Sequence, residues 1–218
     1  MLATKCGSHH IPGNLNTPGL SRHNIIRSVE ESLERLQTSY IDLLYTHVWD
    51  EATPIRETLE SLSWLVEKGK VRYVGCSNMT GWQLQLAAME GRIQHSLGRY
   101  VVLQQQYSLL SREVEWEVTP VARRENIAFV PWSPLKGGWL SGKMRREDKA
   151  APEGSRVGAQ TKDGLKNQAG PNWSDLASRE QTWQILGTLA DIAEKRGKNV
   201  AQVSLRSGGG GRTLQGFI

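Results

Sequence analysis

Short apolar runs alternate with amphipathic helical segments along most of this chain, and that alternation constrains its fold more than any other feature. The runs are almost continuously apolar, as in strands that are buried on both faces of a parallel sheet. We predict strands at residues 2–6, 41–46, 71–76, 100–104 and 127–132. Strand and helix repeat about every thirty residues, which indicates consecutive βαβ units and an α/β fold.

Polar residues that can cap helices stand where several of the helical patterns begin. Such residues satisfy the backbone N–H groups that the first helical turn leaves without partners. The expected caps are Ser21, Thr53 followed by Pro54 at the first helical position, Thr80 with Gln83, and Ser178 with Gln181. The last two pairs have the spacing of a capping box.

Consecutive βαβ units form either an open doubly wound sheet or a closed barrel, and periodicity does not separate the two. No G-x-G-x-x-G motif follows a predicted strand, which counts against a Rossmann domain. Two stretches interrupt the pattern: a long polar segment at 141–176, expected to be either a functional loop or disordered, and a tail at 207–218 with four consecutive glycines. We interpret residues 1–206 as one domain and the tail as a replacement of its original continuation.

The composition is that of an ordinary globular protein, with 38% hydrophobic and 22% charged residues among 218. The net charge of +5 is spread along the sequence, which argues against nucleic-acid binding and favours an ordinary solvated surface. The alternative is a mildly positive field that attracts an anionic cofactor. No apolar run is long enough for membrane insertion. Two cysteines and no signal-peptide pattern indicate a cytoplasmic location.

Several segments, in order, resemble the aldo-keto reductase superfamily and cover nearly all of residues 2–206. Each motif is weak by itself, and their order and spacing make the resemblance strong. The run S-P-L-K-G-G-W-L-S-G-K at 133–143 is most similar to the branch that contains potassium-channel β-subunits and bacterial YajO-like and general-stress reductases. The other matching segments are A-T-K at 3–5, G-L-S-R at 19–22, S-L-E-R-L at 32–36, Y-I-D-L at 40–43, H-V-W-D at 47–50, G-C-S-N at 75–78 and Q-Q-Q-Y-S-L-L at 104–110.

The resemblance implies a (β/α)₈ TIM barrel that binds NADP(H) across the carboxyl ends of its strands and transfers a hydride to a small-molecule aldehyde or ketone. Two residues match the family's catalytic groups. Lys5, at the end of the first predicted strand, matches the lysine that lowers the pKa of a catalytic tyrosine. An ammonium at this position is costly to desolvate unless it has a function. His47 matches the histidine that helps to hold the carbonyl oxygen.

Further residues match the family's cofactor site. Ser77, Asn78 and Gln104 match the groups that hydrogen-bond the nicotinamide carboxamide, and Trp132 matches the aromatic residue that stacks on the ring. The implied pyrophosphate and phosphate contacts are Ser133, Pro134, Leu135, Gly138, Lys143 and Arg156. We expect the five strand ends to converge on one mouth around the nicotinamide. Each position also has a structural alternative: a surface lysine for Lys5, a structural histidine for His47, turn residues for Ser77 and Asn78, a core amide for Gln104, a core aromatic for Trp132, and a solvated loop for Lys143 and Arg156. Adjacent His9 and His10 are interpreted as surface residues, so no metal site is expected.

The match begins at the family's third strand, so we expect an incomplete barrel with five of eight strands. The family's aspartate and its general-acid tyrosine fall outside the match, and we expect impaired catalysis and open, apolar barrel edges that could bind a protein partner. Two alternatives to a reductase remain. One is a non-catalytic NADP(H)-binding or channel-β-subunit-like regulatory protein, and the other is a truncated gene product without independent activity.

Overall fold

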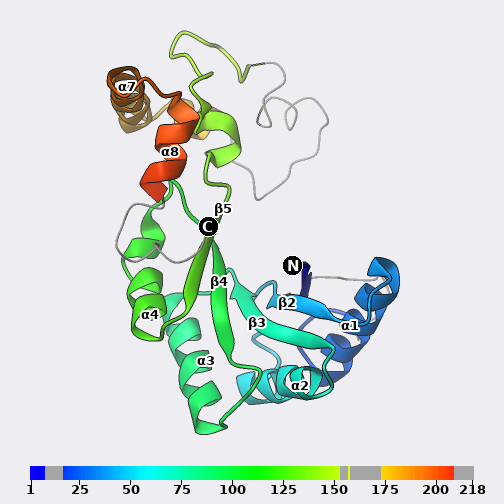
Figure 1. The fold of residues 1–218 in the computed structure, drawn as a ribbon. Coiled ribbons are helices and arrows are strands. Elements are labelled where there is room, and N and C mark those ends of the chain that lie inside the picture. Colours follow the sequence, from blue (N-terminus) through cyan, green and yellow to red (C-terminus); the bar gives the residue numbers. More distant parts are fainter. Residues whose placement is uncertain (8–16, 153–156, 158–172, 209–218) are drawn as a thin grey trace. The chain divides into compact units, whose positions relative to one another are not determined.

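The apolar runs form one five-stranded sheet in the order β1-β2-β3-β4-β5 (Figure 1). A computed structural model describes residues 1–7, 17–152, 157 and 173–208. Its elements are β1 (Ala3–Cys6), α1 (Arg22–Leu36), β2 (Ile41–Thr46), α2 (Ile55–Glu67), β3 (Val71–Ser77), α3 (Gly81–Ile93), β4 (Tyr100–Gln106), the 3₁₀ helix η1 (Glu113–Glu115), α4 (Val118–Arg124), β5 (Ala128–Trp132), the 3₁₀ helix η2 (Lys136–Ser141), α6 (Trp173–Ala177), α7 (Glu180–Lys195) and α8 (Val200–Gly208). All five predicted strands form, and β2 has the predicted bounds.

Strands β1 to β4 are joined by parallel ladders, so their carboxyl ends lie at the same edge of the sheet. A register shift separates the pairs Val74–Tyr100 and Gly75–Val102, which leaves Val101 as an extra residue on β4. Strand–helix alternation with neighbouring strands in sequence order is the arrangement of consecutive units in a (β/α)₈ barrel. The predicted fold class is therefore confirmed.

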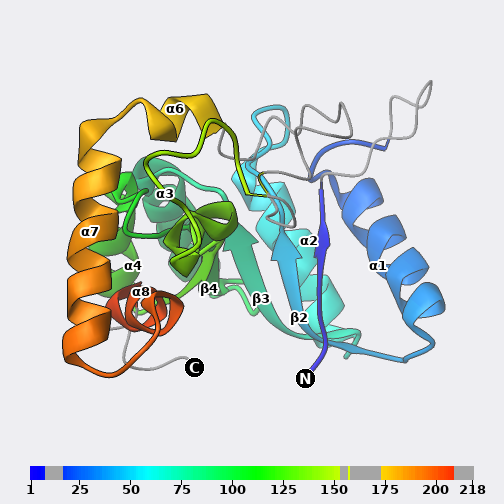
Figure 2. The same cartoon turned by 90° about the horizontal axis from the view of Figure 1, so that it is seen from above.

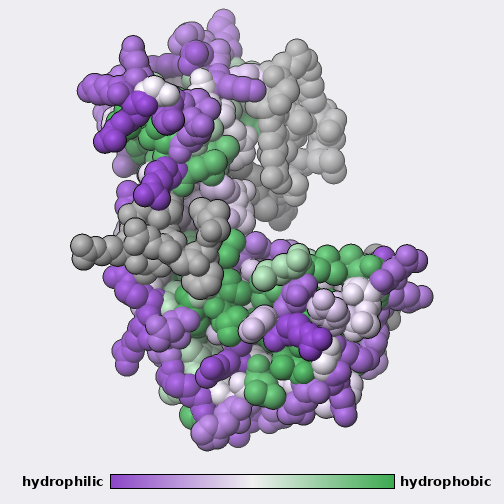
Figure 3. Space-filling model, viewed as in Figure 1, coloured by the Kyte–Doolittle hydropathy of each residue, from purple (hydrophilic) through white to green (hydrophobic). Residues whose placement is uncertain are grey.

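The two faces of the sheet have different environments. Leu44, Val74 and Leu103 are at most 1% exposed on the face that helices α1 to α3 cover (Figure 2). On the other face a separate cluster contains Tyr45, Val102 and Ala128, with the half-buried Leu43 and Val130 packed against it. Figure 3 shows apolar side chains gathered over the strands of the sheet. The near-continuous apolar runs in the sequence follow from this burial on two faces.

Two of the four predicted caps form as expected. The Ser21 hydroxyl accepts a hydrogen bond from the Asn24 N–H at 3.4 Å and begins α1. At α3 the Gln83 side chain accepts from the Thr80 N–H at 2.9 Å, as a capping box requires.

The other two predicted caps are wrong. Pro54, not Thr53, occupies the N-cap position of α2, because the Thr53 hydroxyl donates instead to Asp50 at 2.6 Å. Arg179 is the N-cap of α7, while the Ser178 hydroxyl donates back to the Asp175 carbonyl at 3.0 Å. In both cases a local hydrogen bond competes for the side chain that could have capped the helix.

The described residues divide into two compact units, residues 1–105 with 113–130 and residues 106–112 with those from 131 onward. The second unit has its own core around Trp139, whose ring stacks on Trp173 with centroids 4.7 Å apart. Met144, Val157 and Leu176 complete this core, so part of the predicted loop at 141–176 is packed. Helix α8 ends at Gly208, two residues beyond the predicted domain end at residue 206, and residues 209–218 lie outside the described residues. Among the described helices, none is both long and apolar enough to cross a bilayer.

Candidate functional site

Four neighbouring strand ends in the first unit carry most of the side chains that the sequence singled out. Lys5 pairs with Tyr45 in the β1–β2 ladder, and the His47 N–H continues that ladder by donating to the Cys6 carbonyl at 2.9 Å. Ser77 pairs with Gln104 at the end of the β3–β4 ladder. The parallel registers therefore bring Lys5, His47, Ser77 and Gln104 to one edge of the sheet.

The Lys5 side chain lies over an aromatic ring. Its Nζ is 5.3 Å from the centroid of the Tyr45 ring, within the range of a cation–π interaction. Lys5 is exposed, so the argument that a buried ammonium needs a function does not apply to it. The placement of Lys5 rests instead on its register and on its aromatic neighbour.

His47 is half-buried at the end of β2. Burial lowers the pKa of its imidazole from the usual 6.5, and the positive charge of Lys5 lowers it further. Lys5 and His47 lie at the ends of neighbouring strands, and the ammonium acts on the imidazole through space. A neutral imidazole at this strand end can donate one hydrogen bond to a carbonyl oxygen.

Asn78 connects the ends of β2 and β3. Its side-chain amide donates to the His47 carbonyl at 2.9 Å. The backbone of Asn78 has φ of +54°, in the left-handed region that asparagine tolerates better than most residues. One residue thus supplies both the turn after β3 and a fixed position for the His47 backbone.

Ser77 and Gln104 join the ends of β3 and β4. The Ser77 hydroxyl donates to the Gln104 carbonyl at 2.7 Å, and the Asn78 N–H donates to the same oxygen at 3.3 Å. Ser77 is 1% exposed, whereas Gln104 is half-buried. The Ser77 hydroxyl is therefore held by the sheet itself, and the Gln104 amide is the more accessible of the two.

A concavity of about 520 Å³ lies between the segment around the start of α1 and the loop after β2. Asp50, which lines it, accepts hydrogen bonds from the Leu20 N–H at 2.7 Å and the Ala52 N–H at 2.9 Å. Gly19 has φ of +87°, and a Cβ added there would lie 2.5 Å from an Asp50 carboxylate oxygen. Asp50 therefore fixes the segment after β1 against the loop after β2. The residues that line the concavity are Pro18, Gly19, Ser21, His23, Asp50, Ala52 and Thr53.

Three aromatic residues near this edge were missed in the sequence. Tyr45 lies two positions before His47 on the same face of β2, so strand alternation could have identified it. Trp49 and Trp82 contact each other edge to face with ring centroids 5.6 Å apart, which joins the loop after β2 to the first turn of α3. That contact could not be predicted, because it depends on how two loops pack.

The remaining predicted residues that the structure describes belong to the second unit. Trp132 ends β5, and its carbonyl accepts from the Tyr107 N–H at 3.4 Å. The following turn has positive φ at Ser133 and at Gly138, where φ is +104°. A Cβ at Gly138 would be 3.7 Å from Met144, so its backbone conformation rather than crowding favours glycine there. Pro134 and Leu135 lie within this turn, Lys143 is exposed, and Arg156 lies outside the described residues.

Lys136 is a cation in this turn that the sequence reading did not select. Its Nζ donates to the Ser111 hydroxyl at 2.8 Å, and its N–H donates to the Ser133 carbonyl at 2.8 Å. Lys136 has φ of +48°, which is unusual for a lysine. Its position within the S-P-L-K-G-G segment could have identified Lys136 as a candidate.

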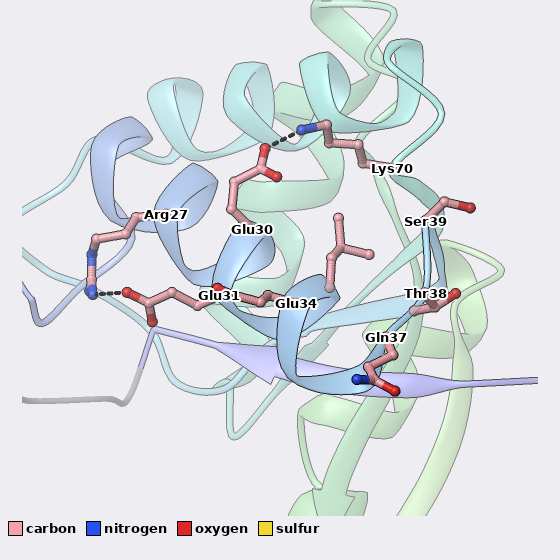
Figure 4. A pocket seen from close by; sticks show the side chains of 9 residues that line it. Arg27, Glu30, Glu31, Glu34, Gln37, Thr38, Ser39 and Lys70 are labelled. Carbon is pink, nitrogen blue, oxygen red and sulfur yellow. Dashed lines mark hydrogen bonds and ion pairs between the residues drawn. The ribbon is translucent and has the colours of Figure 1, made fainter.

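A second concavity lies at the amino ends of the strands, between the C-terminal half of α1 and Lys70 (Figure 4). Arg27 pairs with Glu31 at 2.7 Å, and Lys70 pairs with Glu30. In barrel proteins this end contributes to stability rather than to chemistry. We therefore interpret this concavity as a groove of solvated ion pairs. The described residues also contain no group of three His, Cys, Asp or Glu side chains that could hold a metal, while His9 and His10 lie outside them.

The model of the Aldo/keto reductase family matches residues 1–206. The chain belongs to the aldo-keto reductase family. It is 34% identical over 192 residues to the aldo-keto reductase dtxS3 of Metarhizium robertsii, a match that covers 88% of this chain and 48% of that protein. It is 40% identical over 188 residues to the uncharacterized oxidoreductase YrpG of Bacillus subtilis, covering 86% of this chain and 51% of YrpG.

A third relative is the versiconal hemiacetal acetate reductase of Aspergillus parasiticus, 33% identical over 196 residues, with 88% of this chain and 52% of that protein covered. The chain thus spans about half the length of these three relatives.

Proposed function

We propose that this chain carries the nicotinamide and carbonyl site of an oxidoreductase that uses NADP(H) to reduce aldehydes or ketones. The observation that carries the proposal is that Lys5, His47, Ser77 and Gln104 meet at the carboxyl edge of one parallel sheet. That edge is where barrel enzymes keep their chemistry. The names of two relatives, an aldo-keto reductase and a versiconal hemiacetal acetate reductase, support the reductive direction.

The donor set at the ends of β3 and β4 fits a nicotinamide. A carboxamide has one acceptor oxygen and two N–H donors, so it needs partners of both kinds. The Gln104 amide offers a donor and an acceptor, and the oxygen of Ser77 can accept while its proton is held by the Gln104 carbonyl. When bound, the cofactor would supply the hydride.

In this proposal Lys5 and His47 act on the developing charge of a carbonyl oxygen. The lowered pKa of His47 keeps its imidazole neutral at pH 7, and a neutral imidazole can donate one hydrogen bond to the carbonyl oxygen. The Lys5 ammonium contributes a positive charge at the same edge, and such charge stabilises an alkoxide. Both groups are held by strand ends rather than by long loops.

The proposal is tested by following the near-ultraviolet absorbance of NADPH in the presence of benzaldehyde. We expect aldehyde-dependent loss of absorbance, and Lys5→Met or His47→Ala should lower kcat/KM by at least about 100-fold. Lys149→Met, at an exposed site in the second unit, is the matched control and should have no effect. Binding of NADPH without oxidation would contradict turnover and support a cofactor-binding protein. Absence of both would contradict the whole proposal.

A further inference from the structure

We propose that Tyr45 is a positioning residue that holds the Lys5 ammonium against the face of its ring, and that Gly75 provides the space this ring needs. The effect of Tyr45 on catalysis rests on the proposed function, whereas its effect on the position of Lys5 does not. The three residues lie on neighbouring strands, where Lys5 pairs with Tyr45 and Tyr45 pairs with Gly75.

The contact joins an exposed cation to a buried ring. Lys5 is exposed, whereas Tyr45 is 5% exposed and Nζ lies 5.3 Å from its centroid. The ring is held in place because Tyr45 packs with Val102 and Ala128 in the cluster on this face of the sheet. An immobile ring limits the positions that the long lysine side chain would otherwise sample.

Gly75 is needed for the ring and not for its own backbone, which has strand conformation within β3. A Cβ at Gly75 would lie 2.7 Å from both Cδ1 and Cε1 of Tyr45 and 2.8 Å from Val102 Cγ1. Contacts this short cannot be relieved by a flexible chain end, because the clashing atoms belong to a packed ring. Alanine at this position would therefore push the ring away from its present place under Lys5.

The attraction comes from the face of the aromatic ring, so the tyrosine hydroxyl is not required for it. Phenylalanine at position 45 should keep the effect, and a leucine of similar apolar character should remove it. At an exposed site such an interaction corresponds to a factor of about two to five in an equilibrium. This expectation separates positioning by the ring from a role for the hydroxyl.

The test is the rate at which limiting acetic anhydride acetylates Lys5 in the folded chain, measured by peptide mass spectrometry relative to the exposed Lys149. We expect Tyr45→Leu and Gly75→Ala to raise the Lys5 to Lys149 ratio by about two- to fivefold, and Tyr45→Phe to leave it unchanged. Tyr45→Met serves as a second variant without a ring if the leucine variant does not fold. An unchanged ratio in the variants without a ring, or an equal rise in Tyr45→Phe, would overturn the inference.

Acetylation needs no cofactor, so its outcome is independent of the proposed function. In the NADPH assay, Tyr45→Leu should lower kcat by about two- to fivefold with the KM for NADPH unchanged. Tyr45→Phe should keep the kcat of the wild type. A wild-type chain without turnover would contradict the proposed function, while the acetylation ratio would still decide the role of Tyr45. A kcat equally reduced in Tyr45→Phe would contradict positioning by the ring.

Discussion

The side-chain amide of Asn78 donates a 2.9 Å hydrogen bond to the backbone carbonyl of His47, so the end of β3 holds the end of β2 in place. Asn78→Asp is nearly isosteric and tolerates the same positive φ, but its ionised carboxylate cannot donate. We expect this change to lower the free energy of unfolding by about 1–3 kcal/mol at pH 7, because the hydrogen bond from the side chain at position 78 to the His47 carbonyl is lost. Urea denaturation measures the difference.

Asn78→Gly separates the hydrogen bond from the backbone conformation, since glycine accepts φ of +54° without strain. If the hydrogen bond matters most, the glycine variant should be destabilised as well. A glycine variant as stable as the wild type would show that only the turn geometry is needed.

The charge of Lys5 should be measurable at His47. Burial and the nearby ammonium both lower the pKa of His47 below 6.5, so Lys5→Met should raise that pKa while leaving the effect of burial. An NMR titration of the imidazole resonances, assigned with His47→Ala, measures the change. Lys149→Met is the charge-matched control, and an identical His47 titration in Lys5→Met would contradict the proximity of the two groups.

The sequence predicts β2 well because a strand buried on two faces must be apolar throughout, and Ile41–Thr46 meets that condition. It also predicts that Lys5 and His47 share an edge, since carboxyl ends of parallel strands meet there. It could not predict that Gly75 accommodates the Tyr45 ring, because that contact requires the register between β2 and β3. The cap at Thr53 failed for a related reason, as its partner Asp50 is fixed by tertiary contacts to Leu20.

Asp50 should give the stability an acid dependence. Burial alone would raise the pKa of this carboxyl, but hydrogen bonds from Thr53, Leu20 and Ala52 outweigh it and hold the pKa below 3.8. The carboxylate therefore stabilises the native state above that pH, and this contribution is lost as the pH falls through the lowered pKa.

Asp50→Asn should lower the free energy of unfolding by about 1–2 kcal/mol at pH 7. The difference in the free energy of unfolding between variant and wild type should become smaller in acid. Urea denaturation at a series of pH values measures this difference. A difference that stays constant down to the acid limit would contradict a role for the charged form.

The two cysteines should be inert in the folded chain. Cys6 is 5% exposed and Cys76 is fully buried, and burial raises the pKa of Cys6 to about 12 and that of Cys76 as well. We expect both thiols to react with Ellman's reagent at least about a thousandfold more slowly in the native state than in denaturant. Fast reaction of either thiol without denaturant would contradict the packing of β1 and β3 against the helices.

The central claim concerns where the cofactor binds, and amide chemical shifts recorded during an NADPH titration test it most directly. We predict the largest changes at the carboxyl ends of the strands, at Lys5, His47, Ser77, Asn78 and Gln104. The amino ends of the same strands, Ala3, Ile41, Val71 and Tyr100, are the internal control and should change little. Changes concentrated at those amino ends, or no changes at saturating NADPH, would contradict the account.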